Sequence, residues 1–383
     1  MRRVVVVGAS LAGIRAAEAL RRRGFDAELT VVGTEPGPPY RRPALSKGYL
    51  IGTQAAERIR LVTDAGLDVF PATEAIGLDL RERRVFLSPG GGPAVARPFD
   101  GMVIATGAVA RTLPGLPLAG AYTLRTRQDA EALRAALLSG ASARGKAGRR
   151  LVVVGGGLVG SEVAAAARSL GLAVTLVSRG PGPMTEIFGP EVGRMIARLH
   201  EAHGTRFVAG AATRLEGDDR VRAVRLAVGT AIPADIVLVA IGTRPATDWL
   251  AGSGLLRPDG SLRPGPNLSV ADQITAAGDV ITPAGHWDSA ARQAETAART
   301  LLEGRSAPAF NEVTMFWSGL YGSKLQMIGC PSRNGPVEVA EGSLEEGRCV
   351  LTYGEGTRTT GVLLINSPNR IPAYRPLLAA AAA

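Results

Sequence analysis

The sequence predicts an α/β protein with two Rossmann-like dinucleotide-binding domains and a small α+β domain at its C-terminal end. Two glycine-rich turns carry this prediction, and each directly follows a valine-rich run. The turns are Gly8-Ala9-Ser10-Leu11-Ala12-Gly13 and Gly155-Gly156-Gly157-Leu158-Val159-Gly160. An alanine-rich run with helical spacing and a second apolar run follow each turn, which is the order of a βαβ unit. Two such units in one chain suggest two bound nucleotides.

The expected elements follow from the apolar periodicity along the chain. For the first unit we expect a strand at 4–7, a helix at 12–23 and a strand at 28–32, and then a hairpin within 85–110 and a strand at 102–105. For the second we expect a strand at 151–154, a helix at 160–170 and a strand at 173–177. Further strands are expected at 236–241 and 275–280, with a helix at 289–303. Short alternating runs at 335–340, 349–353 and 361–365 predict the small terminal domain.

The order of these elements indicates that one nucleotide-binding domain is inserted into the other. The strands after Ile236 resemble partners of the first unit. We therefore predict a discontinuous first domain at 1–111 and 237–306, an inserted domain at 112–236 and a C-terminal domain at 307–383.

Composition excludes several classes of protein. The chain has 383 residues, 46% of them hydrophobic, and contains no apolar run of the roughly 20 residues that a membrane helix needs. It starts with Met1-Arg2-Arg3 and enters a strand at once, so we expect no signal peptide and a cytoplasmic protein. The net charge of +10 is carried almost entirely by arginine. Such a charge attracts an acidic partner protein, and the basic stretch 144–150 is either a solvated loop or a docking patch.

Cysteine and histidine are too sparse for a dithiol or a metal site. Cys330 and Cys349 are 19 residues apart and form no CxxC or CxxxxC pair. His200 and His203 lie three residues apart, and we expect them to have a surface or structural role. No metal is predicted.

The two turns differ at the end of the next strand. In each turn the glycines let the backbone approach a pyrophosphate at a helix N-terminus. Glu35, 27 residues beyond Gly8, is placed to accept hydrogen bonds from an adenosine ribose. The second unit has Ser178-Arg179 where an acid would select NAD, and this pair favours the 2′-phosphate of NADPH. The alternative is that Arg179 is an ordinary surface arginine.

Further motifs carry a resemblance that spans nearly the whole chain. They include Tyr40-Arg41-Arg42-Pro43-Ala44-Leu45-Ser46-Lys47, Ala105-Thr106-Gly107, Leu124-Arg125-Thr126, Ala277-Gly278-Asp279-Val280, Phe316-Trp317-Ser318 and Lys324-Leu325-Gln326. With the two turns, they resemble the flavoprotein pyridine nucleotide-disulfide reductase superfamily, which has a glutathione reductase-like fold. More narrowly, the chain is similar to the bacterial ferredoxin and rubredoxin reductases that serve cytochromes P450 and ring-hydroxylating dioxygenases.

The resemblance implies a cofactor for each turn. FAD would be held by Gly8, Ser10, Leu11, Ala12, Gly13, Glu35, Arg42, Lys47, Ala105, Thr106, Gly107, Arg125, Gly278, Asp279, Trp287 and Trp317. NADPH or NADH would be held by Gly155, Gly157, Leu158, Val159, Gly160, Ser178, Arg179 and Gly242. The family pairs the lysine with the glutamate after the second turn, so Lys47 and Glu162 would act as the catalytic pair. Hydride would pass from NAD(P)H to flavin, and electrons would leave singly for a ferredoxin-type iron–sulfur protein.

Several positions depart from the family pattern, and other functions stay open. Arg41, Gly319-Leu320 and Gly285 stand where acidic or amide side chains are usual, and Ser178 and Gly182 replace an acid and an arginine. We expect FAD binding to survive these changes. One alternative is a flavin-dependent oxidase or small-molecule reductase on the same fold. Another is a basic, non-enzymatic flavoprotein that binds nucleic acid, as apoptosis-inducing factor does, although no aromatic-interleaved basic stripe supports it. The chain is expected to be a monomer or homodimer.

Overall fold

A computed structural model describes residues 1–63, 66–139, 149–282, 286–331, 335–356 and 358–379. These residues form two compact units. Unit 1 comprises Met1–Arg41, Ile59–Val109 and Thr243–Glu312, and unit 2 comprises Arg42–Arg58, Ala110–Gly242 and Val313–Ala383. Most of the basic stretch 144–150, together with Gly285, lies outside the described residues.

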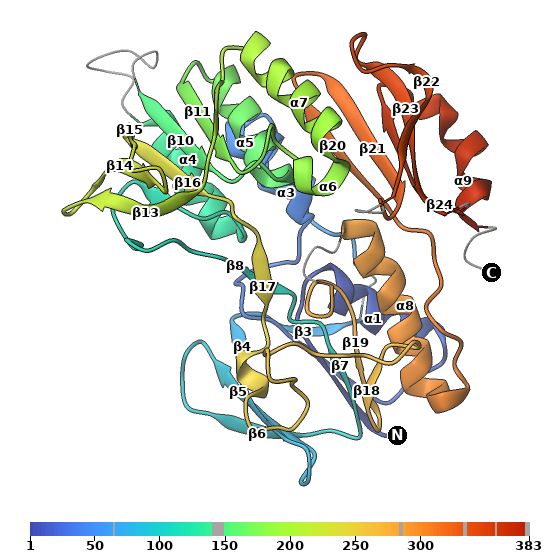
Figure 1. Ribbon diagram of the computed structural model, residues 1–383. Coiled ribbons are helices and arrows are strands. Elements are labelled where there is room, and N and C mark those ends of the chain that lie inside the picture. The colour runs from blue at the N-terminus through green and yellow to red at the C-terminus, as the bar shows by residue number, and fades with distance from the viewer. Residues whose placement is uncertain (64–65, 140–148, 283–285, 332–334, 357, 380–383) are drawn as a thin grey trace. The chain divides into compact units, whose positions relative to one another are not determined.

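Unit 1 is built on a six-stranded sheet with β1 at its centre (Figure 1). In spatial order its strands are β18 (Ser269–Ala271), β19 (Ile274–Ala276), β7 (Gly101–Ile104), β1 (Arg3–Val7), β2 (Glu28–Val32) and β3 (Asp68–Phe70). β1 runs parallel to both β2 and β7. Strands buried on both faces need continuous apolar runs, which explains why the valine-rich segments were predictable.

Each face of this sheet is covered by a different layer. Helices α1 (Leu11–Arg22) and α8 (Trp287–Glu303) pack on one face. The other face is covered by an antiparallel sheet of β4 (Thr73–Asp79), β5 (Arg84–Pro89) and β6 (Val95–Pro98), which contains the predicted hairpin. The short strands β8 (Ala108–Ala110) and β17 (Thr243–Pro245) pair with each other.

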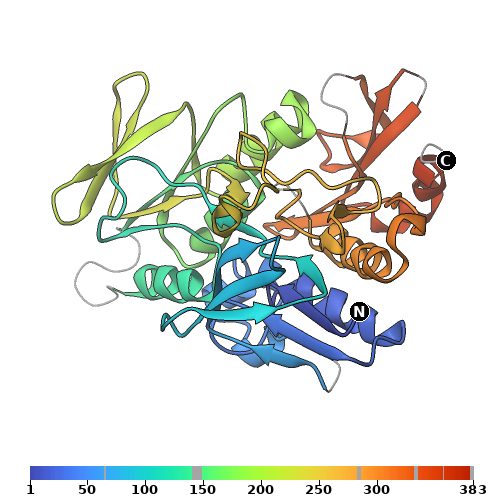
Figure 2. The ribbon, with the colours of Figure 1, turned by 90° about the horizontal axis from the view of Figure 1, so that it is seen from below.

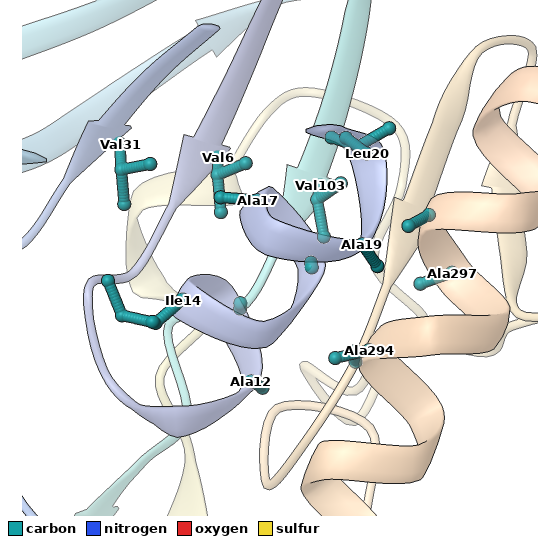
Figure 3. Packing of buried hydrophobic residues seen from close by; sticks show 14 of the residues in the cluster. Val6, Ala12, Ile14, Ala17, Ala19, Leu20, Val31, Val103, Ala294 and Ala297 are labelled. Atoms are coloured by element: carbon teal, nitrogen blue, oxygen red, sulfur yellow. The ribbon is translucent and has the colours of Figure 1, made fainter. Parts of the chain in front are cut away.

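Small side chains let α1 and α8 approach closely. Figure 3 shows Ala12 and Ala19 of α1 with Ala294 and Ala297 of α8 in one buried cluster. Val6 of β1 belongs to the same cluster, so the helix that follows the first glycine turn is fixed to the sheet below it. This packing sets the direction in which the N-terminus of α1 points.

Unit 2 contains a second parallel sheet. In spatial order its strands are β12 (Arg206–Ala209), β11 (Ala173–Ser178), β10 (Arg150–Val154), β16 (Ile236–Val239) and β9 (Ala121–Tyr122). Helices α4 (Arg127–Leu138), α5 (Leu158–Ser169) and α2 (Gly48–Ile51) cover one face. The antiparallel strands β13 (Ala212–Gly217), β14 (Val221–Leu226) and β15 (Ala231–Pro233) cover the other. The short helix α3 (Ala56–Ile59) ends the segment that carries α2.

The predicted boundary at residue 237 is wrong. It falls inside β16, which pairs in parallel with β10 through Leu151 and Ile236 and so belongs to the second sheet. The chain returns to unit 1 only at Thr243. A buried four-residue strand has the same apolar pattern in either sheet, so the pattern alone did not assign it.

The C-terminal region forms an antiparallel sheet with one terminal helix. In spatial order its strands are β20 (Met315–Leu320), β21 (Ser323–Gly329), β24 (Arg358–Ile365), β23 (Arg348–Glu355) and β22 (Val337–Ser343). α9 (Ile371–Ala379) packs beside β24, as Figures 1 and 2 show. The opposite face packs against α6 (Thr185–Phe188) and α7 (Pro190–Ala202), so this α+β region and the second parallel sheet form one compact unit.

Across the described ranges, no helix combines the length and apolar character that a membrane crossing requires.

Candidate functional site

The first glycine turn requires glycine at two positions for packing. Gly8 has a φ of +121°, and its N–H donates to the carbonyl of Val32 at 2.8 Å. A Cβ at Gly8 would lie 2.1 Å from the carbonyl oxygen of Ala105, and one at Gly13 would lie 1.7 Å from that of Gly8. Ser10 is the extended N-cap residue of α1, whose first turn has no acidic side chain. The turn therefore aims a helix N-terminus at the carboxyl edge of the sheet, where a phosphate is stabilised.

The acid predicted to hold a ribose has a partner that the sequence reasoning missed. Glu35 follows β2 and is half-buried, and the Tyr40 hydroxyl donates to its carboxylate. Tyr40 is itself buried and forms a β-bridge with Arg60. The motif contained Tyr40, but nothing in its spacing showed that the ring would orient Glu35.

A second loop lies against the first turn. Gly278 has a φ of +84°, and a Cβ there would lie 3.0 Å from that of Ala12. Its N–H donates to Oε1 of Gln293 at 2.8 Å, and Gln293 is only 5% exposed. Gly278, the residue before Asp279, therefore lies beside the start of α1. Gln293 was missed, because a glutamine on a helix gives no signal of what it contacts.

The remaining unit 1 residues line the same carboxyl edge. Ala105 is buried against Gly8, and the Thr106 hydroxyl donates to the carbonyl of Ala246 at 2.7 Å. Gly107 has a φ of +74°. Trp287 is the first residue of α8 and packs against the cluster of α1 and α8. A helix N-terminus and an acid after the second strand fit the pyrophosphate and ribose of FAD. The family resemblance implies that the Asp279 loop would hold its ribityl chain.

The second glycine turn, in unit 2, repeats this geometry. Gly155 has a φ of +110°, and a Cβ there would lie 2.2 Å from the carbonyl oxygen of Ala240. A Cβ at Gly160 would lie 1.9 Å from the carbonyl oxygen of Gly155, whereas a Cβ at Gly157 would meet no atom within 4 Å. α5 begins at Leu158, and Val159 is 39% exposed. Gly157 therefore leaves open space for a pyrophosphate at the start of α5.

The loop after β11 is folded tightly on this turn. The Ser178 hydroxyl donates to the carbonyl of Arg179 at 3.2 Å. Arg179 is exposed and forms an ion pair with Glu186 at 2.8 Å. A Cβ at Gly182 would lie 1.9 Å from the carbonyl oxygen of Gly193 in α7, so an arginine does not fit there without moving the helix. Close packing on α7 therefore accounts for one departure from the family pattern.

Gly242 ends the strand segment on the other side of the turn. It has a φ of +96°, and its carbonyl accepts the N–H of Arg111 at 2.9 Å.

The predicted pair of Lys47 and Glu162 forms within unit 2. Lys47 Nζ lies 2.6 Å from Oε2 of Glu162, whose side chain is 5% exposed. Two serines complete the site: the Ser46 hydroxyl donates to Oε2, and the Ser318 hydroxyl donates to Oε1 at 2.7 Å. Lys47 also donates to the carbonyl of Pro43 at 3.2 Å. Glu162 thus joins the segment before α2, helix α5 and strand β20, and the sequence reasoning missed both serine contacts.

The other predicted FAD residues of unit 2 have defined places. Arg42 donates to the carbonyl of Arg125 at 2.6 Å. Arg125 precedes Thr126, whose hydroxyl and N–H form a capping box with Asp129 at the start of α4. Trp317 is 44% exposed on β20, and the next residue is the Ser318 that reaches Glu162. The Arg42–Arg125 contact and the Lys47–Glu162 pair are each formed within unit 2.

Two of the three histidines, His200 and His203, form a structural cluster with Tyr321. His200 is fully buried, and its Nδ1 lies 2.9 Å from the Tyr321 hydroxyl. The ring of His203 stacks on Tyr321 with centroids 4.0 Å apart. Burial, helped by the nearby His203, lowers the pKa of His200 to about 4. The described residues contain no group of three or more histidine, cysteine and acidic side chains that could hold a metal.

Comparison with known proteins agrees with this geometry. Residues 2–298 match the family model described as pyridine nucleotide-disulphide oxidoreductase, and residues 315–383 match the one described as reductase C-terminal. The chain is 33% identical to rhodocoxin reductase of Rhodococcus erythropolis, over 98% of this chain and 89% of that protein. It is 34% identical to the biphenyl dioxygenase system ferredoxin–NAD(+) reductase component of Paraburkholderia xenovorans (strain LB400), over 91% of this chain and 86% of that protein.

A solved structure is also similar. The covalent putidaredoxin reductase–putidaredoxin complex gives a TM-score of 0.87 with 28% identity, over 98% of this chain and 93% of that chain. These similarities confirm the predicted fold class. They also confirm an oxidoreductase that uses FAD and NAD(P)H.

Proposed function

We propose that this chain, which belongs to the pyridine nucleotide-disulphide oxidoreductase family, is a reductase for a ferredoxin-type iron–sulfur protein. In this proposal NAD(P)H supplies the electrons, and the iron–sulfur protein passes them to a cytochrome P450 or another oxygenase. The name of the Paraburkholderia xenovorans relative supports the acceptor, since that protein is the ferredoxin–NAD(+) reductase component of a biphenyl dioxygenase system. The absence of a CxxxxC pair from the sequence argues against transfer through a protein disulfide.

The two glycine turns would divide the cofactors between them. We assign the turn at Gly8, the acid Glu35 and the Asp279 loop to FAD, and the turn at Gly157 to the nicotinamide nucleotide. When bound, FAD would supply the conversion between a two-electron hydride donor and a one-electron acceptor, so that each NAD(P)H would reduce two ferredoxins. Tyr40 orients Glu35 for the ribose hydroxyls, and Gln293 holds the backbone that carries Asp279.

The single observation that carries the catalytic assignment is the ion pair between Lys47, whose side chain is 32% exposed, and the buried carboxylate of Glu162. A buried carboxylate is costly without a partner, so it favours a lysine held beside it. Here one carboxylate, itself held by two serine hydroxyls, fixes the ammonium group in one place. We infer that this fixed positive charge stabilises negative charge that develops on the flavin, as the family resemblance implies for Lys47.

The proposal extends to organisation and location. We propose that residues 1–41, 59–109 and 243–312 form the FAD-binding domain. Residues 110–242 would bind the nicotinamide nucleotide, and residues 313–383 would form the terminal domain. Residues 42–58, which carry Arg42 and Lys47, group with these last two and would add to the FAD site from there. We also propose that the protein works in the cytoplasm, as a monomer or homodimer, without binding nucleic acid.

An anaerobic titration tests the proposal. FAD-loaded protein should lose its flavin absorbance on addition of NADPH or NADH and regain it when an oxidised ferredoxin is added. The Lys47→Gln variant should slow flavin reduction, whereas Lys324→Gln, at an exposed lysine of β21, should not. Failure of both nucleotides to bleach the flavin would refute the reductase assignment. Reduced flavin that reacts faster with oxygen than with any ferredoxin would favour the oxidase alternative.

A further inference from the structure

Two opposite charges meet at the position that selects between NADH and NADPH. At the end of the second strand of a Rossmann-like unit, an acid holds the ribose 2′-hydroxyl of NAD, and a basic side chain accommodates the 2′-phosphate of NADP. This chain has Arg179 at that position, directly after β11. Its guanidinium is paired with the carboxylate of Glu186 at 2.8 Å. The arginine that favours NADPH therefore carries an acid beside it.

The backbone, and not only the exposed side chains, fixes this pair relative to the glycine turn. The N–H of Met184 donates to the carbonyl of Gly156 at 2.7 Å. The Thr185 hydroxyl donates to the carbonyl of Gly182, also at 2.7 Å. Gly182 in turn lies directly on the backbone of Gly193. The loop is therefore held on one side by the nucleotide turn and on the other by α7. Glu186 follows two residues after Met184, in α6, so its distance from the turn is constrained.

We propose that Glu186 is a specificity-determining residue that limits the preference for NADPH. This inference rests on the proposed use of a nicotinamide nucleotide at the second turn. Side chains of Arg179 and Glu186 are 72% and 66% exposed, so the pair is weak and opens easily for a ligand. The Glu186 carboxylate nevertheless stays close to Arg179 and repels a 2′-phosphate bound there, which carries between one and two negative charges. The neutral 2′-hydroxyl of NADH meets no such repulsion.

Fragment binding isolates this effect from turnover. FAD-loaded protein is titrated by calorimetry with adenosine 2′,5′-bisphosphate and with 5′-AMP, which differ only in the 2′-phosphate. Glu186→Gln should raise the affinity for the bisphosphate relative to 5′-AMP by about fivefold at low salt, and the gain should shrink at high salt. Arg179→Gln should lower the same ratio. The matched control is Glu191→Gln, which removes an exposed acid from the first turn of α7 and should change the ratio by less than about twofold.

Each outcome decides the inference. An unchanged ratio in Glu186→Gln, in a variant whose melting temperature matches the wild type, overturns it, and so does an equal rise in Glu191→Gln. If neither fragment binds the wild type, the second turn holds no nicotinamide nucleotide, and the inference falls with the proposed electron donor. If the ratio shifts as expected but no ferredoxin is reduced, the inference stands, and only the proposed acceptor is wrong.

Discussion

Removing one hydroxyl group, that of Ser318, should weaken unit 2 more than an ordinary serine-to-alanine change does. Ser318 is 3% exposed, and its hydroxyl donates to Oε1 of Glu162 at 2.7 Å. Ser318→Ala leaves that carboxylate oxygen buried without this donor. A hydrogen bond to a charged group contributes about 2 kcal/mol, whereas one between neutral groups contributes about 1 kcal/mol. We therefore expect Ser318→Ala to lower the free energy of opening of the C-terminal sheet by about 2 kcal/mol.

Hydrogen exchange followed by mass spectrometry measures this quantity in peptides that cover β20 and β21. The matched control is Ser367→Ala, since Ser367 is 6% exposed and its hydroxyl donates to the neutral carbonyl of Ile365 at 3.1 Å. Ser367→Ala should lower the free energy of opening by about 1 kcal/mol. In a Glu162→Gln background, Ser318→Ala should also lower this free energy by only about 1 kcal/mol. The difference from its effect in the wild type is a coupling energy between Ser318 and Glu162 of about 1 kcal/mol.

The reasoning is refuted if Ser318→Ala costs no more than Ser367→Ala, or if the coupling with Glu162→Gln is zero. Either result would mean that the carboxylate recovers a donor, most simply water, when the serine is removed. Glu162 would then not link β20 to the segment that carries Lys47.

Three further predictions test the cofactor sites and the histidine cluster. Gly157→Ala should fold normally, because the new Cβ meets open space, but a titration should show NAD(P)H binding weakened by about tenfold. Gly155→Ala should yield little folded protein, because a Cβ there meets a backbone carbonyl oxygen. Gln293→Leu strands the buried N–H of Gly278 and should raise the FAD dissociation constant by about tenfold in reconstitution of the apoprotein. The pKa of His200 is about 4 in the fold, below its ordinary 6.5, so the unfolded chain binds the extra proton between these values and stability falls as pH falls. From pH 7.5 to 5 His200 should contribute a loss of about 2 kcal/mol in urea unfolding. Burial also lowers the pKa of His286 to about 4, so His200→Gln should keep the His286 contribution and lose about 2 kcal/mol less than the wild type.

The sequence was sufficient for the elements that are buried on both faces. The predicted strands at 4–7 and 28–32 correspond to β1 and β2, and the predicted helix at 289–303 corresponds to α8. Continuous β-branched runs and alanine-rich helical spacing allow few other structures. β16 was assigned to the wrong sheet because its partner is decided by the pairing with β10, which leaves no mark on the sequence of the strand itself.

The hydrogen-bond partners of the predicted site residues were the main omission. Ser318 lies 156 residues from Glu162, and Ser46 lies 116 residues from it. A serine in a strand and a serine in a loop are ordinary residues until the fold brings their hydroxyl groups to one carboxylate. Glu186 escaped notice for the same reason: it is one acid among many until it meets Arg179.

The glycine spacing of the two turns indicates the fold more directly than it indicates the ligand. Gly8 and Gly13, like Gly155 and Gly160, lack room for a Cβ because backbone carbonyl oxygens lie about 2 Å away. Only the middle position faces open space in the second turn, and there the first turn has Ser10. The outer glycines are thus required for a strand–turn–helix unit to pack, whether or not a nucleotide binds. Identifying the ligand depends instead on the residues beyond the next strand, and these are where the two turns differ.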